Sequence, residues 1–102
     1  MILVDDTTFE NFKKASALLL FSAPWCAPCT ALYPTIIKLS EEFPDINFLK
    51  INVDESPDLT SEFGVRTVPT LMFLRDGELV DSLIGVHSLE KLRYVIKENF
   101  NV

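Results

Sequence analysis

The fold is decided by residues 17–29, which read ALLLFSAPWCAPC. The first five of them, Ala17–Phe21, are continuously apolar, a run typical of a strand that is covered on both faces of its sheet. A helical spacing of apolar residues then begins at Cys26 and continues to Phe43. We therefore expect a strand in the centre of a sheet, followed by a long helix whose first turn carries the two cysteines, Cys26 and Cys29.

The remaining elements follow from apolar alternation and from residues that begin or end helices and turns. In chain order we expect a strand at 1–4, a helix from 7 to about 15, the strand at 17–21, the helix at 26–43, a strand at 46–52, a short helix from 57 to 63, strands at 70–74 and 79–84, and a helix at 89–100. This order predicts an α/β fold with a central mixed sheet of about five strands, flanked on both faces by four helices. The 102 residues, of which 48% are hydrophobic, suit one domain over residues 1–102.

Particular residues mark the ends of these elements. The capping-box spacing of Thr7–Glu10 predicts the first helix, and Ser56 and Ser88 are N-cap candidates for the two later ones. Asp76-Gly77 between two apolar runs predicts a tight antiparallel hairpin. Pro34 lies inside the long helix, where it removes one backbone hydrogen bond, so we expect a kink there.

Composition limits the classes of partner. Fifteen acidic against nine basic residues give a net charge of −6, which disfavours nucleic acid and anionic membrane surfaces because both carry phosphate charge. The longest apolar run, Ala17–Phe21, is far too short to span a membrane, and the N-terminus lacks the basic start and cleavage site of a signal peptide. We expect a monomeric, cytoplasmic protein.

The two cysteines are better suited to chemistry than to structure. A disulfide across two intervening residues closes so short a loop that it removes little entropy from the unfolded chain. Free N–H groups and the positive dipole end of the first helical turn stabilise a thiolate at Cys26, and only the thiolate attacks a disulfide. Cys29, one turn further on, is expected to be more buried and to resolve the mixed disulfide. Pro28 stiffens the loop between them.

Two other interpretations concern the same segment. A metal site would need two further ligands, but the chain has no other cysteine and only one histidine, His87, which we expect at the surface. We therefore expect no metal. Trp25 offers a flat apolar surface beside the nucleophile, and ordinary core packing is its alternative role.

The chain resembles the thioredoxin family over essentially its whole length. Trp25–Cys29 matches the active-site motif of that family, with Ala27 where glycine is usual. The other matching segments are Pro34 in the helix, Lys50–Asp54 in a strand, Phe63–Thr70 with its proline, the turn Asp76-Gly77, and Gly85. Together these are far more specific than a CxxC pair alone, and they imply the thioredoxin fold.

The resemblance also implies a substrate site beside the cysteines. The peptide bond between Val68 and Pro69 would be cis, which would aim the backbone of Val68 at the cysteines and let it hold an extended substrate strand. Trp25, Val68, Gly85 and Val86 would form an apolar docking rim. A trans proline at a strand edge is the alternative for Pro69.

Beneath the cysteines the chain departs from the family. Leu20 stands where thioredoxins usually keep a buried aspartate that moves protons to and from the second cysteine, and Ser22 stands in place of a usual tryptophan. Lys50 thereby loses its expected ion partner, and its alternative role is that of a strand lysine reaching solvent. With Ala27 and Pro28, Leu20 and Lys50 are expected to tune the pair. A lysine without the carboxylate favours thiolate, which would make the protein more oxidising than ordinary thioredoxins.

The resemblance implies a thiol–disulfide oxidoreductase that reduces protein disulfides, with Cys26 as nucleophile and Cys29 as resolving thiol. Its partners would be disulfide-containing substrate proteins and an NADPH-dependent thioredoxin reductase that supplies electrons, with no bound cofactor. Two alternatives stay open. One is a more oxidising disulfide oxidase or isomerase, and the other is a binding module of the same fold that acts without redox chemistry.

Overall fold

Five strands form one mixed sheet in the computed structural model, which describes residues 1–102. The elements are β1 (Ile2–Val4), η1 (Phe9–Phe12, a 3₁₀ helix), β2 (Ala17–Ser22), α1 (Ala27–Glu42), β3 (Asn47–Asn52), α2 (Pro57–Glu62), β4 (Thr70–Arg75), β5 (Glu78–Ile84) and α3 (Leu89–Phe100). The strand order is β1-β3-β2-β4-β5, in which β1, β3 and β2 run parallel while β4 is antiparallel to both β2 and β5. The predicted α/β fold with a five-stranded mixed sheet is confirmed.

β2 lies in the centre of the sheet, as its unbroken apolar sequence predicts. It pairs with β3 on one side and β4 on the other, and all six of its residues are buried. Alternate side chains point to opposite faces, so Leu18 and Leu20 enter one core cluster while Leu19 and Phe21 enter the other. Both faces of the sheet are therefore covered.

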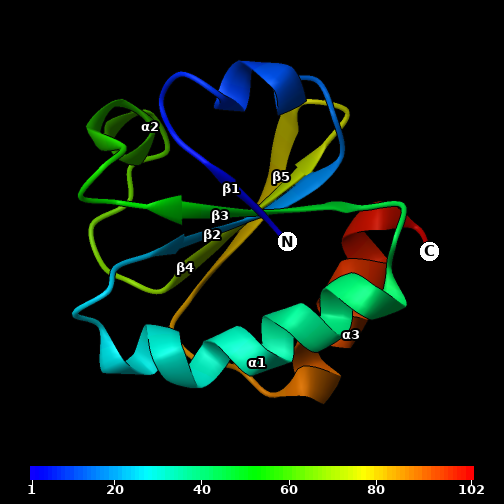
Figure 1. Cartoon of the computed structure of the whole chain (residues 1–102). Coiled ribbons are helices and arrows are strands. Elements are labelled where there is room, and N and C mark those ends of the chain that lie inside the picture. The colour runs from blue at the N-terminus through cyan, green and yellow to red at the C-terminus, as the bar shows by residue number, and fades with distance from the viewer.

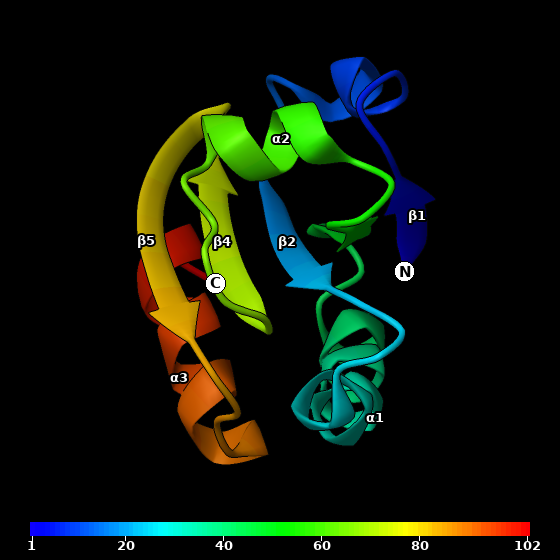
Figure 2. The same cartoon turned by 90° about the vertical axis from the view of Figure 1, so that its left-hand side faces the viewer.

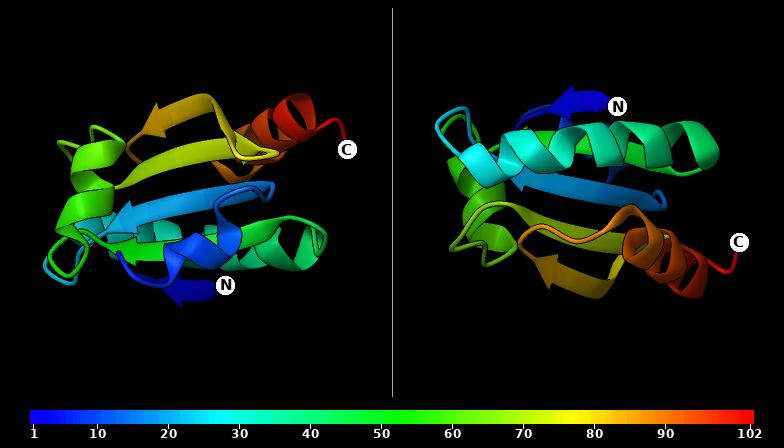
Figure 3. Two further views of the ribbon diagram at one scale, coloured as in Figure 1. Left: turned by 90° about the horizontal axis from the view of Figure 1, so that it is seen from above. Right: turned by 90° about the horizontal axis from the view of Figure 1, so that it is seen from below.

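Helices form the covering layer on each face. α1 and α3 lie on one face of the sheet, and η1 and α2 lie on the other (Figures 1 and 3). Leu32 and Ile36 of α1 and Leu92 and Ile96 of α3 are fully buried in the same cluster as Leu20. A short loop from the end of β2 leads directly to the start of α1, at one edge of the molecule (Figure 2). None of the helices has the length and apolar content needed to span a bilayer.

The two long helices have the predicted bounds to within one residue. Cys26 is the N-cap and Phe43 the C-cap of α1, which continues through the exposed Pro34. At α3, the hydroxyl of Ser88 accepts the N–H of Lys91 at 3.1 Å, so the predicted cap is confirmed. The kink at Pro34 stays a prediction.

The hairpin between β4 and β5 turns at Asp76-Gly77, as predicted. Both residues have positive φ, 52° and 86°, which is the backbone that a two-residue turn between twisted strands requires. A Cβ atom at Gly77 would also lie 2.9 Å from the carbonyl oxygen of Lys13. The position therefore requires glycine for two separate reasons.

The first predicted helix is wrong in extent. Only η1, a single 3₁₀ turn, forms between residues 7 and 15, and neither threonine side chain caps it. The Oδ1 of Asp5 accepts the N–H groups of both Thr7 and Thr8, at 2.9 and 3.0 Å. Because this carboxylate holds the backbone in a turn, it competes with the capping box. The molecule has three α-helices and one 3₁₀ turn instead of four helices.

The predicted cap of α2 is also wrong. Ser56 occupies the N-cap position, but its hydroxyl accepts no N–H, is buried and has no hydrogen-bond partner. Instead, the carboxylate of Asp6 accepts the N–H groups of Asp58 and Leu59, at 3.1 and 2.9 Å. The cap thus comes from a segment about fifty residues earlier in the chain.

Candidate active site

The paired cysteines lie where the chain passes from β2 into α1. They form a disulfide, with their Cα atoms 5.3 Å apart. The backbone of Cys26 is extended, at φ −95° and ψ 106°, so this residue precedes the first helical turn, and its sulfur accepts the N–H of Cys29 at 3.2 Å. The sulfur of Cys26 therefore occupies the position in which helices stabilise a negative charge.

The two cysteines are equally buried, each with 5% of its surface exposed. The expectation that Cys29 is the more buried one is therefore wrong for this disulfide form. Val53 and Val68 pack against the small cluster made by Ala23 and the two cysteines. Residues distant in the sequence thus cover Cys26. The helix position of the cysteine motif does not predict this covering.

The loop before β4 lies against the cysteines and is bonded to the end of β5. The peptide bond between Val68 and Pro69 is cis, as the resemblance implied, so the trans alternative is wrong. The carbonyl oxygen of Val68 lies 3.6 Å from the sulfur of Cys26. The N–H of Gly85 donates to the carbonyl of Pro69 at 2.9 Å, and Gly85 has a φ of +90°. This bond joins the loop before β4 to the end of β5.

Exposed apolar side chains occur at the predicted docking positions. Trp25 is 69% exposed and Val86 is 53% exposed, so ordinary core packing does not describe Trp25. Sequence reasoning missed Ile84, the last residue of β5, which is 67% exposed. Its place in an apolar strand predicts burial, but α2 does not cover that edge of the sheet (Figure 2).

Asp54 is a second residue that sequence reasoning missed. The indole Nε1 of Trp25 donates to Oδ2 of Asp54 at 2.8 Å. A signal was available in the sequence, because the strand segment that matches the family ends at Asp54. β3 runs parallel to β2, so the residues that follow β3 lie at the same edge of the sheet as the cysteines that follow β2. The hydrogen bond holds the ring of Trp25 beside the disulfide.

Lys50 lies behind the cysteines without an ion partner. Leu20, its register partner on β2, is fully buried hydrocarbon, and neither ion pair of the molecule includes Lys50. The ammonium group sits 4.5 Å from the ring centroid of Tyr33 in α1, a cation–π contact. The predicted loss of an ion partner is confirmed, whereas the contact with Tyr33 was missed.

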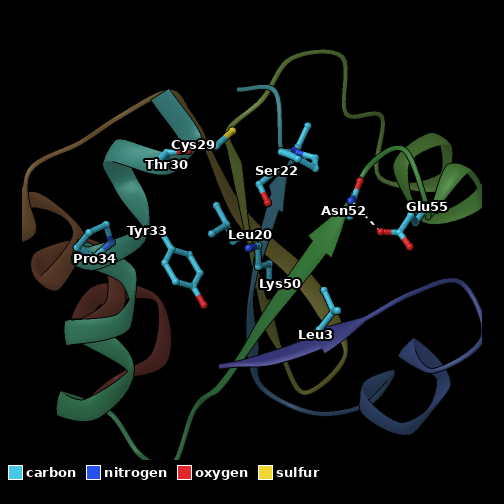
Figure 4. A pocket seen from close by; sticks show the side chains of 12 residues that line it. Leu3, Leu20, Ser22, Cys29, Thr30, Tyr33, Pro34, Lys50, Asn52 and Glu55 are labelled. Carbon is cyan, nitrogen blue, oxygen red and sulfur yellow. Dashed lines mark hydrogen bonds between the residues drawn. The ribbon is translucent and has the colours of Figure 1, made fainter. Parts of the chain in front are cut away.

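A cavity of about 510 Å³ separates Lys50 from Cys29 and is lined by both. Figure 4 shows that the side chains around it come from α1 and from strands β1, β2 and β3. Leu20 and Tyr33 line its centre, and Glu55 lines its opposite end, where it accepts a hydrogen bond from Asn52 at 2.9 Å. Behind the disulfide there is therefore a cavity whose lysine has no ion partner.

The remaining predicted site residues have simple positions. Ala27 and Pro28 are both exposed in the first turn of α1, where proline has no N–H to leave unpaired. The half-exposed His87 has its Nε2 3.0 Å from the carbonyl oxygen of Ile84. No group of three or more histidine, cysteine or acidic side chains is placed to hold a metal ion.

Known proteins share this arrangement. A sequence model of the thioredoxin family, described as "Thioredoxin", matches residues 1–98. Thioredoxin-2 of Pyricularia oryzae is 40% identical over 98 residues, which are 91% of this chain but only 57% of that protein, so the chain spans little more than half of its length. The thioredoxin of Rickettsia typhi is 41% identical over 93 residues, or 87% of this chain and 89% of that protein. Other similar thioredoxins are named as mitochondrial or chloroplastic.

Among solved structures, one matching chain comes from a study of the thiol-resolving mechanism in yeast mitochondrial 1-Cys peroxiredoxin via glutathione and thioredoxin systems. It aligns with a TM-score of 0.87 at 34% identity and covers 96% of this chain and 94% of that one. The family match extends over all of the residues that build the sheet, the disulfide and the loop of Pro69. The chain therefore belongs to the thioredoxin family.

Proposed function

We propose that this chain reduces disulfides in other proteins, as a thiol–disulfide oxidoreductase with Cys26 as nucleophile and Cys29 as resolving thiol. One observation carries the proposal. The sulfur of Cys26 accepts the N–H of Cys29 at the start of a 16-residue helix, which is where a thiolate is stabilised. In the reduced form this N–H donates to the attacking sulfur.

The reaction proceeds in two exchange steps. The Cys26 thiolate attacks one sulfur of the substrate disulfide, so that a mixed disulfide forms and the other substrate sulfur leaves as a thiolate. The Cys29 thiolate then attacks the sulfur of Cys26, which forms the internal disulfide seen here and releases the second substrate sulfur. Two electrons pass from the dithiol to the substrate, and the departing thiolates take up the two protons.

The loops beside the disulfide hold the substrate. The backbone of Val68 faces Cys26 and can pair with an extended segment of the substrate by main-chain hydrogen bonds, which tolerates many substrate sequences. Trp25, Gly85 and Val86 supply an apolar rim around it, and Ile84 extends this rim along β5. Disulfide-containing proteins are therefore the proposed substrate class.

The reduced state is restored from outside the chain. An NADPH-dependent thioredoxin reductase is the proposed electron donor, because that enzyme typically reduces members of the family to which the chain belongs. We further propose that the protein is a monomer and works in the cytoplasm, where the glutathione and thioredoxin systems keep thiols reduced. Light scattering tests the first of these statements, and subcellular fractionation tests the second.

Lys50 and Leu20 are proposed to make the pair more oxidising. A lysine that lines the same cavity as Cys29, with no carboxylate beside it, stabilises negative charge on that sulfur and so favours the reduced form. The midpoint potential, measured against glutathione, should lie above the value of about −270 mV typical of thioredoxin. Lys50→Gln should lower it, whereas Lys13→Gln should leave it unchanged. A wild-type value at or below about −270 mV would remove this proposal.

A trapping experiment tests the main function. With Cys29→Ser the mixed disulfide on Cys26 cannot be resolved, so substrate proteins should accumulate on it. The matched control, Cys26→Ser, should capture nothing and should not reduce insulin disulfides. An empty trap together with slow insulin reduction by the wild type would contradict the proposal.

The missing carboxylate favours one alternative, a disulfide oxidase or isomerase, and a high midpoint potential together with fast oxidation of reduced substrates would support it. The other alternative is a binding module that needs no redox chemistry. Replacing both cysteines by serine distinguishes this binding module from an oxidoreductase, because only a binding module still supports the function of its partner after that change.

A further inference from the structure

The cavity behind Cys29 holds no substrate in the proposed exchange reaction. It holds about 510 Å³, a volume within the range of small-molecule sites. Its walls are largely hydrocarbon from Leu3, Leu20 and Pro34, together with the ring of Tyr33. Figure 4 shows this space between α1 and the strands, and neither Val68 nor Gly85 of the proposed substrate loops lines it. A ligand there would not compete directly with a substrate strand.

One charged group in the cavity, the ammonium of Lys50, has no ion partner. Lys50 is half-buried, makes no side-chain hydrogen bond and belongs to neither ion pair. Its ammonium group contacts the face of Tyr33, and no protein oxygen accepts a hydrogen bond from it. Glu55 also lines the cavity, but its carboxylate accepts a hydrogen bond from Asn52 beyond the end of β3, at the opposite end of the cavity from Tyr33 (Figure 4). A half-buried cation attracts an anion more strongly than an exposed one does, because solvent screens it less.

We infer that this cavity binds a small organic monoanion, a carboxylate with a compact aromatic or aliphatic body. The carboxylate would accept hydrogen bonds from the Nζ of Lys50, and the body would lie against Tyr33 and the exposed side chain of Leu3. The ligand thus supplies both the negative charge and the apolar volume that this part of the protein lacks. This binding is separate from the proposed disulfide chemistry and does not depend on it.

A second cavity of the molecule provides an internal comparison. It has nearly the same volume, about 520 Å³, and it also contains one lysine, Lys13. That lysine is paired with Glu10 at 3.9 Å, and three further carboxylates, those of Asp6, Asp58 and Glu62, line the same cavity. Its excess of negative charge disfavours anions. The two cavities therefore have nearly equal volumes, but the unpaired charge is a cation in the first and carboxylates in the second.

The test is an NMR titration of the oxidised protein at low ionic strength with benzoate and with benzamide, its uncharged counterpart. Benzoate should bind about tenfold more tightly than benzamide, because only the anion makes a charge-assisted bond to Lys50. The largest shifts should fall on the methyl groups of Leu3 and the ring of Tyr33. Lys50→Gln should abolish the preference for benzoate, Lys50→Arg should retain it, and the control Lys13→Gln should leave it unchanged.

Three results would overturn the inference: equal affinity for the two probes, a preference that survives Lys50→Gln, or shifts centred on Leu59 and Phe63 of the second cavity. Leu20→Asp adds an independent check, since a carboxylate beside Lys50 should exclude benzoate. Insulin reduction is measured on the same samples without probe. Failure of the anion site therefore leaves the redox assignment untouched, and loss of reductase activity does not affect the binding result.

Discussion

The N-termini of α1 and α3 are capped with the same geometry by different atoms. In α1 the sulfur of Cys26 accepts the N–H of Cys29 at 3.2 Å, and in α3 the hydroxyl of Ser88 accepts the N–H of Lys91 at 3.1 Å. Cys26 is 5% exposed beneath the loop of Val68, whereas Ser88 is exposed. The comparison teaches that the capping bond is a local device, and that the chemistry depends on the capping atom and on what packs over it.

The largest expected effect comes from changing the capping atom of α1. Cys26→Ser keeps an acceptor for the Cys29 N–H, so the fold should persist, but disulfide reduction should fall by at least about a thousandfold because the nucleophile is gone. Insulin reduction measures the rate, and circular dichroism checks the fold. Ser88→Ala is the matched control and should retain wild-type activity. Comparable activity losses in both variants would mean that the two caps do not differ in function.

Next in size is a change behind α1. Leu20→Asp places a carboxylate where 0% of the side chain is now exposed, and we expect a loss of about 3 kcal/mol in the free energy of unfolding. Proton transfer at Cys29 should become faster because a local acid and base is restored. Urea unfolding and stopped-flow measurement of the resolving step test the two parts. Leu20→Asn, which is polar but cannot ionise to a base, controls for polarity. Unchanged stability with unchanged rates would count against the argument.

The stability of the caps themselves should differ by less. Ser88→Ala should cost about 1 kcal/mol, the usual value for losing an N-cap acceptor. Ser56→Ala should cost close to nothing, because the hydroxyl is buried without a partner and Asp6 caps α2 in its place. Urea unfolding of the two alanine variants gives the comparison directly. Equal losses would show that Ser56 contributes as much as Ser88.

The smallest effect concerns the ion pair that links the same two helices. Arg93 of α3 donates to the carboxylate of Glu42 in α1 at 2.8 and 2.6 Å, and this hydrogen bonding holds the pKa of Glu42 below its ordinary value of 4.5. A lowered pKa in the folded state stabilises the fold above the unfolded pKa, and that contribution is lost as pH falls from about 4.5 through the folded value. Glu42→Gln should flatten the acid side of the stability profile. If the free energy of unfolding of Glu42→Gln depends on pH as that of the wild type does, the ion pair makes no pH-dependent contribution and the prediction is wrong.

Much of the site could be predicted because its signals are local. The apolar run before Cys26, the proline between the cysteines and the Asp-Gly turn each act within a few residues, and the structure has each where expected. Asp6 illustrates the opposite case, since it caps a helix that starts more than fifty residues later. Ser56 has the local pattern of an N-cap, but Asp6 accepts the N–H groups of α2 in its place. Sequence signals for caps are reliable only when no distant acceptor reaches the same N–H groups.

The sequence by itself determined the order of strands and helices, the central place of β2 and the position of Cys26 at a helix start, because hydrophobic periodicity and capping act over one or two turns. The tertiary structure alone decided that Val68 covers Cys26, that Asp54 holds Trp25 and that Lys50 meets Tyr33 beside an open cavity. These contacts join segments from different strands and helices, so they exist only once the sheet and its two helical layers have packed.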